Sequence, residues 1–265
     1  MASKSTSNDQ IKKRKGKGKG KRNGQEPPKL VIDALLECYN SGSYNQAEIQ
    51  AVDIVQMYPN HPFGWKALGI ILARTGRLKE SLDPLGRAVL LNPDDPAAQS
   101  NLGNALKDMG YFEEAEQRYR KAIILKPDFV QAHINLGLTL RNLRNLDAAE
   151  ACYRRALLLN PANAEIYNNL GIVLRELGRC EEAEVCYQQA ISLKPDSDAY
   201  YSNLGNVLWD LRRYSEAEDS YRKALEFKKS AAVYSNLGNV LADQKLNNSG
   251  FSGSVRPDNG NSGGE

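Results

Sequence analysis

The sequence predicts an all-α fold of stacked helical hairpins. Proline recurs at intervals of 34 residues, at Pro59, Pro93, Pro127, Pro161 and Pro195. Ahead of most of these prolines the same order returns, an Asn-Leu-Gly triplet followed by Leu, Ala, Tyr and Ala. Each unit also holds two stretches with apolar residues at helical spacing. One hairpin cannot bury its apolar face alone, but stacked neighbours can, so the pattern predicts a continuous array.

The repeat divides the chain into an array and two flanking segments. We expect residues 1–27 to form a disordered basic arm and residues 244–265, rich in Gly, Ser and Asn, to form a disordered tail. In the unit 198–230 Lys228 and Lys229 replace the proline, and no second helix is predicted for the partial unit 231–243, so we expect a truncated or degenerate version of a longer array. The predicted array covers 28–243, with units at 28–61 (divergent), 62–95, 96–129, 130–163, 164–197, 198–230 and 231–243 (partial).

Glycine inside a predicted helix needs a packing reason, because it costs about 1 kcal/mol relative to alanine. It recurs within the first helix of the units, at Gly69, Gly103, Gly137, Gly171 and Gly205. We expect the missing side chain to let the second helix approach, with Ala115, Ala149, Ala183 and Ala217 supplying the matching small surface. Gly76, Gly110 and Gly178 fit the left-handed residue that ends a first helix.

Composition narrows the class of protein. No apolar run approaches eighteen residues, which predicts no integral membrane segment. The N-terminus lacks the apolar stretch of a signal peptide. The four cysteines form no Cys-x-x-Cys pair, which favours a reduced, cytoplasmic chain, with the nucleus as the alternative in a eukaryotic cell.

The order of residues resembles the tetratricopeptide repeat family over roughly residues 28–243. In the unit 96–129 the resemblance is carried by Leu102, Gly103, Leu106, Gly110, Ala115, Tyr119, Ala122 and Pro127. It implies a right-handed α-α superhelix, a solenoid whose first helices line a concave groove. The Asn-Leu-Gly wording is most similar to the repeat domain of protein O-linked N-acetylglucosamine transferases, although no nucleotide-sugar-binding domain is predicted here.

An asparagine series is the clearest candidate site. Asn101, Asn135, Asn169, Asn203 and Asn236 stand directly before each Leu-Gly, and the unit 62–95 departs with Ala67. A side-chain amide offers an acceptor and two donors, and so can pair with a peptide unit of an extended ligand. The resemblance implies that these five form a ladder that holds peptides. The alternative is a repeat residue that satisfies local backbone.

Further candidates lie beside this series. Asn104, Asn206 and Asn239 come one helical turn later. Lys107, Arg141 and Arg175 share a position that suggests tolerance of an acidic ligand. Trp209 occupies the same position, either as a binding hot spot or partly buried against the next repeat.

The N-terminal arm is strongly basic. Residues 1–30 carry ten Lys or Arg against two acidic residues, whereas the rest carries 25 basic and 30 acidic residues. The segment 12–22 could bind an anionic partner, either nucleic acid or an anionic membrane, or serve as a nuclear localisation signal. The alternative is a solubilising tail.

Catalysis is not indicated. His61 falls in an inter-repeat turn and His133 at a packing position, and acidic pairs such as Glu113-Glu114 open second helices, where the helix dipole favours them. We predict no catalytic residue, no metal and no cofactor. Three readings follow: a scaffold that binds an extended peptide or partner protein, a non-catalytic targeting part of an O-linked N-acetylglucosaminyltransferase-type system, and self-association through the partial last repeat.

Overall fold

The computed structural model describes residues 26–251, and all the regular structure in that range is helical. The helices are α2 (Lys29–Asn40), α3 (Tyr44–Met57), α4 (Pro62–Arg74), α5 (Leu78–Leu91), α6 (Pro96–Asp108), α7 (Phe112–Leu125), α8 (Val130–Asn142), α9 (Leu146–Leu159), α10 (Ala164–Glu176), α11 (Cys180–Leu193), α12 (Asp198–Asp210), α13 (Tyr214–Phe227) and α14 (Ala231–Phe251). The prediction of an all-α fold of hairpins is confirmed. The predicted basic arm lies almost wholly outside the described residues, as does the end of the predicted tail.

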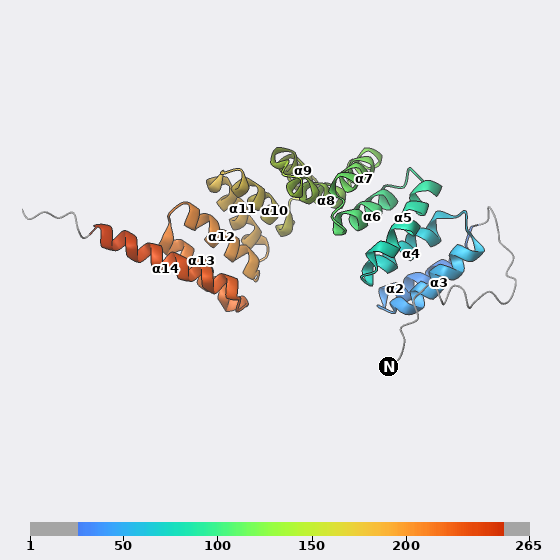
Figure 1. Ribbon diagram of the computed structural model, residues 1–265, viewed down its shortest axis with the longest axis horizontal. Coiled ribbons are helices and arrows are strands. Elements are labelled where there is room, and N and C mark those ends of the chain that lie inside the picture. The colour runs from blue at the N-terminus through green and yellow to red at the C-terminus, as the bar shows by residue number, and fades with distance from the viewer. Residues whose placement is uncertain (1–25, 252–265) are drawn as a thin grey trace, which may run out of the picture. The chain divides into compact units, whose positions relative to one another are not determined.

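The helices form two compact units, one reaching Lys126 and the other beginning at Pro127 (Figure 1). Within each unit every helix packs on the next one in the sequence. First helices of successive hairpins also touch, α4 with α6 in the first unit and α8, α10, α12 and α14 in turn in the second. No comparable contact joins successive second helices of the described chain. The first helices therefore lie on the inner side of each unit.

Sequence-coded caps set the ends of the helices. The Asp95 carboxylate accepts hydrogen bonds from the backbone N–H groups of Ala97 and Ala98, and the Asn163 side chain caps α10 in the same way. The turn inside a hairpin needs a left-handed residue. Gly76, Gly110 and Gly178 fill it as predicted, with φ of 79°, 82° and 78°.

Four of the five glycines inside the first helices face tyrosines of the second helices, and Gly69 faces Leu85. A Cβ on Gly103 would lie 2.9 Å from Cε1 of Tyr119, and a Cβ on Gly171 would lie 2.8 Å from Cε1 of Tyr187. The prediction that alanines such as Ala183 fill this gap is corrected, because the flat ring enters it. The rings of Tyr119, Tyr153, Tyr187 and Tyr221 are at most 1% exposed, so each is clasped between the two helices of its hairpin.

Helix α14 is longer than the sequence predicted. The partial unit was expected to end at residue 243, but the helix continues to Phe251, so the prediction of disorder fails for residues 244–251. Residues 242–246 contain neither glycine nor proline, and nothing in them stops a helix. The Asp243 carboxylate also accepts a hydrogen bond of 2.8 Å from Nε1 of Trp209, which ties this turn to α12.

No helix among residues 26–251 combines the length and the apolar character that crossing a bilayer requires.

Candidate functional site

A hollow of about 400 Å³ opens on the inner side of the first unit. Helices α2, α4, α5 and α6 line it with Tyr39, Ile70, Ala73, Arg74, Leu85, Asn101, Asn104, Ala105 and Asp108. Two asparagines predicted from the sequence thus share one concave surface. An apolar floor with a few polar groups at its edge is the usual composition of a binding site.

Asn101 is the free amide of this hollow. Its side chain is half-buried and makes no hydrogen bond within the described chain. Its acceptor and both donors are consequently open to a ligand that enters the hollow. Asn104, one turn further along α6, differs, because its Oδ1 accepts a hydrogen bond of 2.8 Å from the phenol of Tyr119.

The second unit carries the other four members of the series on α8, α10, α12 and α14. Asn135, Asn169, Asn203 and Asn236 are all half-buried. Gln131 donates to Asn135 Oδ1 over 3.0 Å within α8. Asn203 donates to Asn168 Oδ1 of α10 over 2.8 Å. The amides of neighbouring first helices therefore form a polar strip, and none of the four is withdrawn from the surface.

The second asparagine series has a structural task that sequence reasoning missed. Asn206 Oδ1 accepts hydrogen bonds from the Tyr221 phenol, over 2.7 Å, and from Asn236 Nδ2, over 3.1 Å. Asn104 serves Tyr119 likewise. The acceptor oxygens of both asparagines are occupied within their own hairpins, so we no longer assign them to a ligand. Asn239 is exposed on α14, the last helix of residues 26–251. The only available sequence signal was the spacing of fifteen residues between amide and phenol.

The first hairpin of the second unit, α8 with α9, lacks this acceptor. Leu138 stands where α6 and α12 have Asn104 and Asn206, and the buried Tyr153 hydroxyl has no hydrogen-bond partner in the described chain. An unsatisfied buried hydroxyl costs about 1–3 kcal/mol.

We therefore expect Tyr153→Phe to raise the free energy of unfolding by about 1 kcal/mol, because it removes an unpaired polar group. The matched change Tyr221→Phe should lower it by about 1 kcal/mol, because it breaks the bond to Asn206. Urea unfolding of both variants measures the difference, and equal effects of the same sign would contradict this account.

The basic residues beside the ladder are all paired with acids, and the two arginines reach acids of the next hairpin. Arg141 donates to Glu176 over 2.8 Å, and Arg175 donates to Asp210 over 2.5 Å. The hydrogen bond to Asp210 is the main cause of the raised pKa of Arg175. Lys107 pairs with Asp108 of its own helix. The predicted tolerance of an acidic ligand is thereby weakened, since each positive charge already faces a carboxylate.

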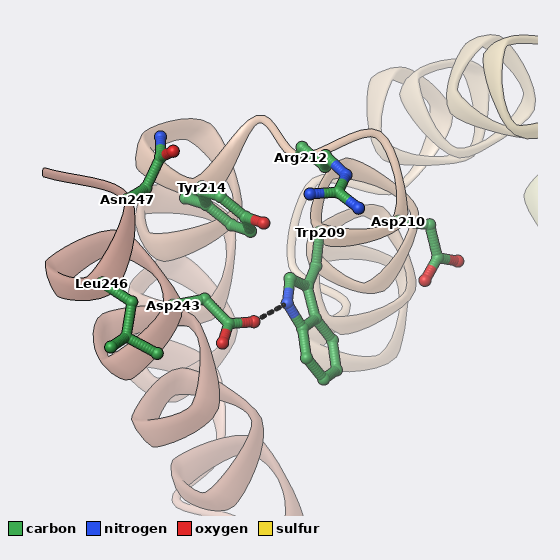
Figure 2. Close-up of a pocket in the computed structure, with 7 residues that line it drawn as sticks. All are labelled: Trp209, Asp210, Arg212, Tyr214, Asp243, Leu246 and Asn247. Atoms are coloured by element: carbon green, nitrogen blue, oxygen red, sulfur yellow. Dashed lines mark hydrogen bonds between the residues drawn. The ribbon is translucent and has the colours of Figure 1, made fainter. Parts of the chain in front are cut away.

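Trp209 occupies the equivalent position on α12 and lines a second hollow of about 490 Å³ (Figure 2). The indole edge points to Asp243 of α14, and its Nε1 donates there over 2.8 Å. The indole is half-buried against the last repeat, as one of the two alternatives predicted, and its role as a binding hot spot stays a prediction. Exposed Arg212 and Leu246 lie on the same rim.

The two histidines have structural partners. Nε2 of His133, a buried residue, lies 3.0 Å from the carbonyl oxygen of Pro127, and the side chains of Trp65 and Gln99 donate to the carbonyl oxygens of the equivalent prolines, Pro59 and Pro93, each of which ends the preceding unit. Nδ1 of His61 accepts from the backbone N–H of Phe63 at the start of α4. Among residues 26–251 no group of three or more potential metal ligands comes together.

Repeated hairpins that present amides and hollows on their first helices define a helical-repeat protein with a binding surface. Family models described as tetratricopeptide repeat match residues 128–196 and 164–230, and one described as TPR repeat matches residues 104–143. Residues 104–230 are thus similar to tetratricopeptide repeats, and proteins built of such repeats generally act as scaffolds for protein–protein interaction. A comparison with curated protein sequences finds no match.

Solved structures share the fold. MamA from Desulfovibrio magneticus is 22% identical with a TM-score of 0.60, and the match covers 64% of this chain and 96% of that one. YrrB, described as a TPR protein with an unusual peptide-binding site, is 18% identical with a TM-score of 0.60, over 74% and 98% of the two chains. The Cut9–Hcn1 heterotetramer of the APC/C gives 21% identity and a TM-score of 0.66, over 80% and 42%.

Proposed function

We propose that this protein is a scaffold that binds an extended peptide segment of a partner protein on its first helices, through the amides of Asn101, Asn135, Asn169, Asn203 and Asn236. The observation that carries the proposal is Asn101, whose unpaired amide stands at a hollow of about 400 Å³. An amide pairs with the backbone of a ligand, so the scaffold would bind extended chains with little sequence preference.

The composition of the hollow supports an extended ligand. Ile70, Ala73 and Leu85 supply apolar side chains to the lining, which also holds the polar groups of Asn101 and Asp108. A strand-like segment buries alternate side chains and leaves its backbone N–H and C=O groups at the sides, where amides can reach them. Arg74, exposed at the same hollow, adds one cation for an acidic side chain.

The double substitution Asn135→Ala with Asn169→Ala tests the proposal in the second unit. For a peptide selected from a random library, we expect affinity to fall about thirtyfold, because each lost amide pair is worth about 1 kcal/mol. The measurement is fluorescence anisotropy of the labelled peptide. Asn160→Ala, at the exposed C-terminal end of α9, is the matched control. Unchanged affinity in a folded double variant contradicts the ladder.

A second proposal follows from the resemblance of the Asn-Leu-Gly units to the repeat domain of O-linked N-acetylglucosamine transferases. The array would then be a non-catalytic targeting part that holds substrates for a separate glycosyltransferase. Its support is the triplet at positions such as 169–171 and 203–205. Sugar transfer to a bound peptide, measured with a transferase domain and its nucleotide-sugar donor with and without the array, tests it. An equal transfer rate in both reactions rejects it.

A further inference from the structure

Helix α14 stands where the first helix of the last, partial unit is expected. It exposes a surface that the first helices of the earlier hairpins bury. Tyr201, Gly205 and Leu208 of α12 pack against α13: Tyr201 stacks on Phe227 with ring centroids 5.7 Å apart, and Leu208 is 3% exposed. The equivalent residues of α14 are Tyr234, Gly238 and Leu241. Tyr234 is 52% exposed, Gly238 is exposed, and Leu241 is half-buried.

The helical glycines show most clearly how α14 differs from the first helices of the earlier hairpins. A Cβ on Gly205 would lie 2.8 Å from Cε1 of Tyr221, and the same holds for Gly171 and Tyr187. A Cβ on Gly238 would meet no atom within 4 Å. The slot that receives a tyrosine ring in the four hairpins from α6 to α13 is therefore built into α14 and stands open among the described residues. Residues 235–265 contain no tyrosine, so this stretch does not repeat the pattern that fills the slot in the earlier hairpins.

An unpaired carboxylate oxygen marks where a second helix would begin. In the second unit, Glu150 Oε1 binds Arg154 of its own helix, and Glu150 Oε2 binds Arg179, the residue just before the next second helix, over 2.7 Å. Glu184 binds Arg213 in the same way over 2.6 Å. The equivalent Glu218 binds only Arg222, through Oε1. Its Oε2 has no partner in the described chain, so this carboxylate oxygen is available to bind an arginine.

We propose that a helix from another polypeptide docks on α14 and completes the last hairpin. The existing hairpins define its chemistry, an arginine followed by Ala, Tyr and Ala at spacings of four, four and three, as in Arg213, Ala217, Tyr221 and Ala224. The tyrosine enters the slot at Gly238, the alanines lie on α14, and the arginine binds Glu218. This docking face is separate from the asparagine strip and does not depend on peptide binding there.

The probe is a synthetic peptide with the sequence of residues 212–228, held helical by a staple between the outward positions of Asp219 and Lys223. We expect it to bind the full chain, and Gly238→Leu to weaken that binding at least about tenfold by filling the slot. Gly238 is helical with free space beside it, so this variant should keep its fold, which circular dichroism checks. Asn135→Ala with Asn169→Ala should leave docking unchanged.

The charge contact has its own test. Glu218→Gln should weaken binding about threefold, as expected for a partly exposed ion pair. A peptide with glutamine in place of Arg213 should lose about the same factor, with little further loss when both changes are combined. Absence of binding, or equal binding to Gly238→Leu, overturns the proposal. A chain that forms dimers which Gly238→Leu dissociates would also overturn it, because a second copy would then cover the face.

Discussion

Raising the pH from 10 to 11 is expected to lower the free energy of unfolding of the second unit by roughly 3 kcal/mol. The cause is its three clasped tyrosines, Tyr153, Tyr187 and Tyr221, which are at most 1% exposed. Burial raises the pKa of Tyr221 to about 12 and raises the pKa of the other two as well.

The sign follows from where each state holds its protons. Tyrosines of the unfolded chain ionise near pH 10, while those of the folded unit keep their protons. Each tyrosine therefore makes its full contribution to the free energy of unfolding below pH 10. This contribution is lost as the pH rises toward the pKa that the tyrosine has in the folded state. As the pH rises from 10 to 11, each tyrosine lowers the free energy of unfolding by about 1 kcal/mol.

Urea unfolding at a series of pH values, followed by tyrosinate absorbance, measures this loss. Tyr153→Phe should reduce the slope by about a third, because one of three titrating groups is removed. Tyr111→Phe, a change at an exposed ring of the first unit, is the control and should leave the slope unaltered. A free energy of unfolding that stays constant between pH 9 and 11 would contradict the buried tyrosines.

Replacing Gly171 by alanine is expected to lower the free energy of unfolding by about 2 kcal/mol. The new methyl group would lie 2.8 Å from Cε1 of Tyr187, and the ring cannot retreat because it is buried on all sides. The same change at Gly238 should raise the free energy of unfolding by up to about 1 kcal/mol, since alanine favours the helix and meets nothing.

The two alanine variants occupy equivalent positions in the repeat, so helix propensity acts on both alike. The difference between their free energies of unfolding therefore isolates the contact between the helical glycine and the tyrosine ring. Thermal and urea unfolding of the two proteins provide the measurement. Destabilisation at Gly238 equal to that at Gly171 would show that the slot at α14 is not open.

The hairpin array was predictable because its signal is repeated. Five prolines follow one another at intervals of 34 residues, and the turn glycines at positions 76, 110 and 178 identify where the first helices end. The glycines inside the first helices also announced a close approach. Pairing the glycines with small residues such as alanine did not predict that a tyrosine ring fills this gap. The flat face of Tyr187 fits beside Gly171 better than the size of the side chain alone suggests.

The sequence predicted which helices carry the candidate site residues, but not the hydrogen-bond partners of those residues. The helical register placed the asparagines on the first helices, as found. It could not show that Asn206 serves Tyr221 or that Arg175 is held by Asp210, because these partners come from other helices. Of the first asparagine series, Asn101 is the member whose amide the structure leaves without a partner, which makes it the sharpest site to test.

Backbone recognition by the asparagine series is the central claim, and a double-mutant cycle tests it most directly. The cycle combines Asn101→Ala with N-methylation of one backbone amide at a time in a bound peptide, with affinity measured by calorimetry. We expect one N-methyl position to weaken binding about tenfold in the unaltered protein and to have almost no effect in Asn101→Ala. An equal loss in both proteins at every position would show that the Asn101 amide does not contact the peptide backbone.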